Sequence, residues 1–105
     1  MKRLKLTAAV MMVLAPQPAL ADSFEIANKL GVVIGSEKYC GLKYTQPAIE
    51  AFIEKHVAAD DMDFPGNLQG AVTLTRFNNK SQTESSKTAH CSQVRRLAKA
   101  YGFID

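Results

Sequence analysis

The two cysteines of this 105-residue chain lie in the segments Glu37-Lys38-Tyr39-Cys40-Gly41-Leu42 and Lys87-Thr88-Ala89-His90-Cys91-Ser92-Gln93-Val94. A bond between them would close a loop of about 50 residues. In the chain-entropy model such a loop stabilises a protein by up to ~4 kcal/mol, against a total stability of roughly 5–15 kcal/mol. We therefore predict that a Cys40–Cys91 disulfide is the main covalent constraint on the fold.

The wide spacing of the cysteines favours a structural role for this disulfide. A redox-active dithiol normally has its two cysteines only two residues apart, beside a helix N-terminus. Small exported domains commonly use disulfides to supplement a modest hydrophobic core. The pattern therefore predicts a structural disulfide and not a catalytic one.

Residues 1–21 have the pattern of a secretory signal peptide. Three basic residues precede an apolar stretch at 6–15, and Ala19-Leu20-Ala21 fits the small-x-small rule for cleavage before Asp22. The apolar stretch is about 10 residues long, whereas a transmembrane helix needs roughly 20. We expect a cleaved leader, a single domain at 22–105, a periplasmic or secreted location, and no stable membrane anchor.

The positive charge of the chain belongs to this leader. The whole chain has a net charge of +3, but the leader holds three of its 13 basic residues and none of its 10 acidic ones. Residues 22–105 are therefore neutral overall. A nucleic-acid partner would need a basic surface, so we expect no nucleic-acid binding.

Charge is unevenly distributed along the predicted domain. Residues 22–63 carry eight acidic and four basic residues, whereas residues 64–105 carry six basic and two acidic residues. Such patterns often reflect solvation and the packing of complementary helices. The alternative is a docking surface for an acidic partner, for which the candidate residues are Arg95, Arg96 and Lys99.

The apolar spacing predicts an all-α domain, a small bundle of about four helices held by one disulfide. The first helix is expected over about 23–40 and ends at Gly41, with Gly31 and Gly35 either weakening it or marking a close helix contact. Thr45 is a candidate N-cap for the second helix, with Pro47 in its first turn. The inner positions of that helix are Ile49, Phe52, Ile53, His56 and Val57.

The second half of the chain is less regular. Phe64-Pro65-Gly66 is expected to form a turn in which Phe64 is a buried anchor. Residues 68–77 suit either a helix or a strand, and a helix is favoured because a single strand would lack a partner. The last helix is expected over about 83–101, capped by Thr83 or Ser81 and ended by a Schellman motif at Gly102-Phe103. Its predicted inner positions are Cys91, Val94, Ala98 and Tyr101, with Leu97 beside them.

No catalytic, metal or cofactor motif stands out. His90 is next to Cys91, so their side chains would diverge on a helix, and His56 is expected to be a partly buried, hydrogen-bonded residue. The acidic turn lacks the glycine and the final glutamate of a calcium-binding loop; its residues are Asp60, Asp61 and Asp63. We expect a non-enzyme without a bound metal or cofactor.

Several segments resemble small exported alphaproteobacterial helical proteins of unknown function, which are often labelled "signal recognition particle". The resemblance covers most of residues 22–105 and implies no established activity or catalytic residues. The segments that carry it are Glu37-Lys38-Tyr39-Cys40-Gly41-Leu42, Ala48-Ile49-Glu50-Ala51-Phe52-Ile53-Glu54-Lys55, Lys87-Thr88-Ala89-His90-Cys91 and Tyr101-Gly102-Phe103-Ile104.

A weaker, architectural resemblance is to the periplasmic acid-stress chaperones of the HdeA type. It rests on the leader, the small helical domain and the long-range cysteine pair, and this chain lacks a tryptophan before its first cysteine. The resemblance implies opening at low pH to bind clients, and it transfers no functional residue.

These patterns together predict a small exported binding module whose partner is another envelope protein or a peptide. One alternative is an acid-stress chaperone. The alternative from another class is a carrier of a small ligand or metal that uses His56, His90 and the acidic turn.

Overall fold

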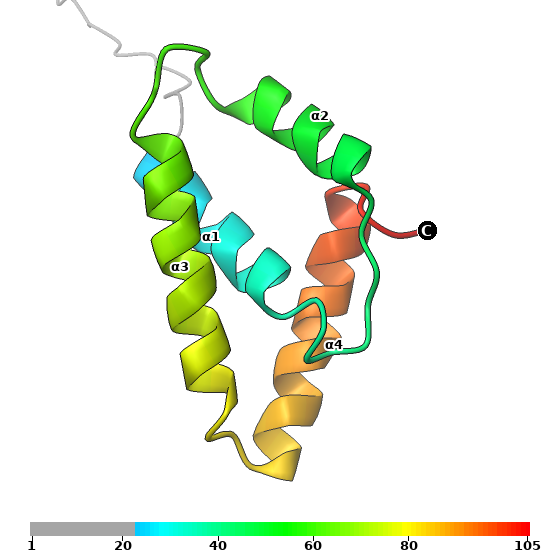
Figure 1. Ribbon diagram of the computed structural model, residues 1–105. Helices are drawn as coiled ribbons and strands as arrows, with labels where there is room; N and C mark the ends of the chain where they lie inside the picture. Colours follow the sequence, from blue (N-terminus) through cyan, green and yellow to red (C-terminus); the bar gives the residue numbers. More distant parts are fainter. Residues whose placement is uncertain (1–22) are drawn as a thin grey trace, which may run out of the picture.

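The computed structural model describes residues 23–105, and the predicted leader lies outside the described residues. Within this range the fold is all-α, which confirms the predicted fold class. None of the described helices is long and apolar enough to cross a membrane. The helices in chain order are α1 (Ser23–Gly35), α2 (Gln46–His56), α3 (Phe64–Asn79) and α4 (Glu84–Ala100) (Figure 1).

Helices α1 and α3 lie side by side and run in the same direction (Figure 1). Gly31 faces Ala71, and four residues later Gly35 faces Thr75. A Cβ atom at Gly31 would overlap the Cβ of Ala71, and one at Gly35 would lie 2.9 Å from the Cβ of Thr75. The two glycines therefore mark a close helix contact, as one of the two sequence interpretations proposed.

Helix α1 ends at Gly35, five residues before the predicted end, so Cys40 lies in the following turn and not on the helix. The regular hydrogen-bond ladder stops because the Glu37 N–H donates to the Ile34 oxygen, three residues back. Residues 36–41 then form hydrogen-bonded turns. They close as a Schellman motif at Gly41, the predicted stop residue, where φ is +69° and the Leu42 N–H reaches the Glu37 oxygen at 2.8 Å.

Helix α2 begins as predicted, because the Thr45 Oγ1 accepts a hydrogen bond from the Ala48 N–H at 3.3 Å. The prediction for His56 was wrong: its side chain is exposed, with its ring centroid 4.4 Å from that of Phe52. His56 is the last residue of α2, so the helix has no further turn to cover it. Phe52, one turn earlier, packs against Tyr101 with ring centroids 4.4 Å apart.

Helix α3 includes the segment for which helix and strand were both considered. Its first residue is Phe64, so Phe64-Pro65-Gly66 is the first turn of a helix and not a separate turn as predicted. Pro65 is tolerated there because the first N–H groups of a helix have no partner within it. Phe64 is 3% exposed, which confirms that it is a buried anchor.

Helix α4 has both predicted ends. The Thr83 Oγ1 accepts from the Ser86 N–H at 3.2 Å. At the other end Gly102 has φ +83°, and the Phe103 N–H donates to the Ala98 oxygen at 2.8 Å, as in a Schellman motif. This turn directs Phe103 into the core.

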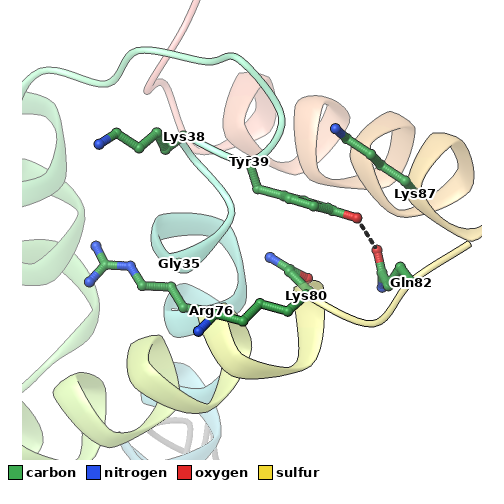
Figure 2. A pocket seen from close by; sticks show the side chains of 8 residues that line it. Gly35, Lys38, Tyr39, Arg76, Lys80, Gln82 and Lys87 are labelled. Carbon is green, nitrogen blue, oxygen red and sulfur yellow. Dashed lines mark hydrogen bonds between the residues drawn. The ribbon is translucent and has the colours of Figure 1, made fainter. Parts of the chain in front are cut away.

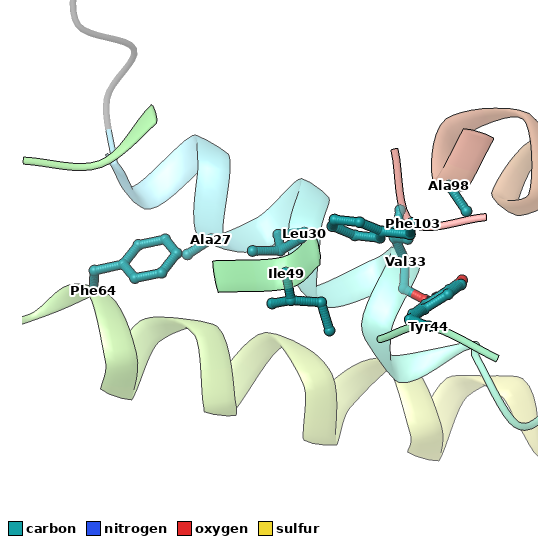
Figure 3. Packing of buried hydrophobic residues seen from close by; sticks show 8 residues of the cluster. All are labelled: Ala27, Leu30, Val33, Tyr44, Ile49, Phe64, Ala98 and Phe103. Atoms are coloured by element: carbon teal, nitrogen blue, oxygen red, sulfur yellow. Dashed lines mark hydrogen bonds between the residues drawn. The ribbon is translucent and has the colours of Figure 1, made fainter. Parts of the chain in front are cut away.

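The hydrophobic core joins α1 to side chains from every other helix, from the α1–α2 connection and from the segment after α4 (Figure 3). Its buried members are Ala27, Leu30, Val33, Tyr44, Ile49, Phe64, Ala98 and Phe103.

Tyr44, which the sequence analysis did not single out, links three parts of this core. Its hydroxyl donates to the Val33 oxygen at 3.0 Å, and its ring lies 5.3 Å from that of Phe103. Its own N–H donates to Glu37 Oε2 at 2.7 Å. Burial, and next the negative charge of Glu37, raises the pKa of Tyr44 to about 12.

The helix contact predicts the effect of alanine at Gly31. The added Cβ of Gly31→Ala would collide with Ala71, so we expect a loss of about 1–3 kcal/mol in the free energy of unfolding. Gly70→Ala is the matched control, because a Cβ at Gly70 meets no atom within 4 Å and should stabilise α3 by up to ~1 kcal/mol. Urea unfolding of the three proteins measures both changes; equal effects would contradict the close contact.

The raised pKa of Tyr44 predicts a loss of stability in alkaline solution. In the unfolded chain this hydroxyl ionises near pH ~10, whereas the folded protein holds the proton until about 12. The unfolded state therefore releases this proton first, and the free energy of unfolding falls as pH rises through that window. Tyr44→Phe should be less stable by about 0.5–1.5 kcal/mol near neutral pH and should lack this part of the slope. Parallel slopes for the two proteins would contradict the assignment.

Candidate functional site: a cationic pocket

The predicted interaction face on α4 is exposed, but its three residues do not converge on one point. Successive side chains on a helix diverge by about 100°. Arg95 borders a pocket next to Cys40 and Cys91, whereas the Arg96 Nη1 donates to Gln93 Oε1 at 2.8 Å. Lys99 is exposed one turn beyond Arg95.

A different set of basic residues surrounds a pocket of about 540 Å³. Lys38 comes from the turn after α1, Arg76 from the last turn of α3, Lys80 from the residue after α3, and Lys87 from the first turn of α4. No acidic residue lines this cationic pocket. Its other lining residues are Gly35, Tyr39, Asn79 and Gln82 (Figure 2).

Tyr39 is held in a fixed position in the middle of the cationic pocket. Its hydroxyl donates to Gln82 Oε1 at 3.1 Å, and the Lys87 Nζ lies 4.6 Å from the centre of its ring (Figure 2). A lysine over an aromatic face is attracted to the negative ring surface. The contacts of Tyr39 therefore connect the turn after α1 to the α3–α4 connection and to α4.

A buried hydrogen-bond cluster supports the same wall of the pocket. Ser36 is fully buried, its Oγ lies 2.8 Å from His90 Nε2, and it accepts from Asn79 Nδ2 at 3.2 Å. Asn79 is itself only 5% exposed. Breaking a buried hydrogen bond leaves an unsatisfied polar group at a cost of about 1–3 kcal/mol. The cluster therefore fixes the turn after α1 against the ends of α3 and α4.

The Cys40–Cys91 disulfide, as predicted, ties this turn covalently to α4. The two Cα atoms are 5.3 Å apart, and the bonded residues are 51 positions apart in sequence. Cys91 directly follows His90, so the disulfide and the Ser36 cluster anchor neighbouring points of the turn to neighbouring points of α4.

Within residues 23–105, none of the four cations of the pocket forms an ion pair. The ion pair in this range joins Lys29 to Glu25, on α1. The nearest acid in sequence to Lys38 is Glu37, whose Oε2 is occupied by the Tyr44 N–H. Four unneutralised positive charges around one pocket create a local positive potential that favours an anion. Lysine offers a mobile point charge to a carboxylate, and arginine offers a paired, planar donor.

The residues considered for metal binding do not come together. His90 contacts Ser36 and has its ring centroid 6.3 Å from that of Tyr39, whereas His56 lies against Phe52 on α2. The acidic residues Asp60, Asp61 and Asp63 lie between α2 and α3. In the described part of the chain, no group of three His, Cys, Asp or Glu residues could hold a metal ion.

Sequence reasoning found the charge imbalance but not this pocket. Arg76, Lys80 and Lys87 all belong to the half of the chain that carries excess positive charge. Lys38 belongs to the acidic half, and it reaches the pocket only because the turn after α1 packs between α3 and α4. The regular spacing of Arg76 and Lys80, four residues apart, was the available signal.

A scan against protein-family models and searches of the curated proteins and of the solved structures found no match to the chain. The assignment of a site therefore depends on the geometry alone.

The charge of the pocket predicts that neutralising one of its cations will not harm the fold. In dilute buffer, Lys80→Gln should leave the free energy of unfolding unchanged or raise it by up to ~0.5 kcal/mol, because it relieves repulsion. Lys29→Gln is the control, since it removes an ion pair and should cost about 0.3 kcal/mol. Thermal unfolding at low and high salt measures both; a clear loss for Lys80→Gln would show that its charge has a stabilising partner.

Proposed function

We propose that the protein is an exported, non-enzymatic binding module that captures an acidic segment of another envelope protein or peptide in the cationic pocket. The observation that carries this proposal is that four basic residues, from three separate segments, line one pocket that no acid lines. Export is part of the proposal and is supported by the leader pattern at 1–21 and by the disulfide.

The rigidity of the pocket supports a binding role. Tyr39 and the turn that carries Lys38 are fixed by hydrogen bonds and by the disulfide before any ligand arrives. A ligand therefore has little backbone ordering to offset when it binds. The cationic side chains themselves are exposed and have several rotatable bonds, so they can adapt to carboxylates at more than one spacing.

The extent of the positive surface favours a peptide segment over a small molecule. A second pocket of about 650 Å³ shares Lys38 and Arg76 with the cationic pocket and adds Lys43 and one acid, Glu37. A third shares Tyr39 and Lys87 and adds Arg95 and one acid, Glu84. The three pockets are neighbours because they share these residues, and six basic residues line them against two acidic ones, more cations than a single small anion would use.

The direct test is binding of an acidic peptide, such as a fluorescent hexamer rich in glutamate, with a glutamine-rich hexamer as the neutral control. Arg76→Glu/Lys80→Glu should weaken binding of the acidic peptide more than tenfold. Arg96→Glu/Lys99→Glu makes the same charge change at two exposed residues of α4 that do not line these pockets, and it should weaken binding less than threefold. Affinity should also fall with added salt.

Each other result has a defined meaning. Equal losses for the two double variants would show a response to net charge, which contradicts a specific site. Tighter binding of free citrate or glutamate than of the peptide would favour a small-ligand carrier. Tighter binding of a single-stranded oligonucleotide of equal charge would point to a nucleic-acid partner, and both results would contradict the proposal.

A further inference from the structure

A pocket of about 480 Å³ opens directly onto the disulfide and adjoins the cationic pocket, with which it shares Tyr39 and Lys87. We propose that the Cys40–Cys91 disulfide is a site of thiol–disulfide exchange with an external dithiol, and that its reduction weakens the cationic pocket. The second half of this proposal rests on the proposed function, and the first half does not.

The two sulfur-bearing residues differ in access. Cys91 lies on the inner side of α4 and is 8% exposed, whereas Cys40 is half-buried in the turn after α1. Both line the same pocket, together with Gly41, which has no side chain to block the approach. An incoming thiolate therefore has its easier path to the sulfur of Cys40.

The charges beside Cys91 make it the better leaving group. Lys87 and Arg95 lie four residues before and four residues after Cys91 on α4, about 6 Å along the helix axis in each direction, and both border the pocket. Glu84 also borders the pocket but lies seven residues away, about 10 Å along the axis. Positive charges near a sulfur stabilise its thiolate, and a stabilised thiolate leaves faster.

The exchange balances without any further reactant. The first thiolate of the dithiol attacks Cys40 Sγ, the Sγ–Sγ bond breaks, and its electron pair leaves on Cys91 Sγ. The second thiol of the same reagent molecule, as a thiolate, then attacks the reagent sulfur that is bonded to Cys40 and releases Cys40 as a thiolate. The dithiol is oxidised to a disulfide, the protein is reduced to two thiols, and the protons lost by the reagent are taken up by the two cysteines.

Reduction acts on the cationic pocket through the turn after α1. Cys40 adjoins Tyr39, and Lys38 precedes Tyr39, so the disulfide is the covalent support of that wall. Without it the turn keeps the hydrogen bonds of Ser36 and of Tyr39. We therefore expect the reduced protein to stay folded, with the turn after α1 held less firmly against the cationic pocket. By thermodynamic linkage, a peptide that prefers the oxidised form must also disfavour reduction.

The exchange site is tested by the rate of reduction with dithiothreitol, without peptide, followed by mass spectrometry after alkylation. Arg95→Gln should slow the reaction about two- to fivefold, and added salt should reduce the difference. Lys99→Gln, two turns from Cys91, is the matched control and should react like the wild type. Equal rates for Arg95→Gln and Lys99→Gln would overturn the assignment.

A second measurement separates exchange in the folded protein from exchange after unfolding. Phe64→Leu removes part of a buried anchor at the first residue of α3, whereas the turn after α1 contacts the last residue, Asn79, so this variant destabilises the fold away from the disulfide. If the folded protein reacts, this variant should be reduced at the wild-type rate. An increase that matches the increase in its unfolding constant would show that the disulfide is reached only by global unfolding, and would overturn the proposal.

The link to the pocket is tested with the wild type, so it does not depend on a variant that folds poorly. The acidic hexamer at saturation should slow reduction at least threefold, and the reduced, alkylated protein should bind it at least threefold more weakly. Equal affinities would overturn the link. Failure of the oxidised protein to bind the peptide would overturn the link together with the proposed function, while the exchange rates above still decide the exchange site.

Discussion

The contact between α1 and α3 at Gly31 and Gly35 is the constraint on which the arrangement depends. It brings two parallel helix backbones so close that even one methyl group at Gly31 would overlap Ala71. Because of this contact, the chain leaves α1 beside the end of α3. Ser36 can then accept a hydrogen bond from Asn79, the last residue of α3.

Two further connections convert this helix pair into a framework for a site. Ser36 contacts His90, and the next residue of α4 forms the disulfide with Cys40. The turn from Ser36 to Cys40 is therefore fixed at its start by a buried polar cluster and at its end by a covalent bond. The fixed turn places Lys38 beside three cations of α3, α4 and their connection, so the four cations line one pocket although the sequence does not group them.

Local chemistry allowed much of the fold to be predicted. Thr45, Thr83 and Gly102 act through bonds within four or five residues, so their roles can be recognised without a structure. The cysteine pair was predictable because the chain has only two. The early end of α1 was not, because the predicted stop at Gly41 is real but the helical ladder breaks before it. The exposure of His56 and the pocket around Lys38 depend on which neighbours each helix end meets in space, and periodicity carries no information on that.

The central claim is that an acidic segment binds where the turn after α1, the end of α3 and the start of α4 meet. The most direct measurement is a two-dimensional amide NMR titration of the oxidised protein with the acidic hexamer. The account predicts that the largest shifts occur at Lys38, Tyr39, Lys80, Gln82 and Lys87, with little change at Arg96 and Lys99. Shifts concentrated on Arg96 and Lys99, or spread evenly over all exposed lysines and arginines, would contradict it.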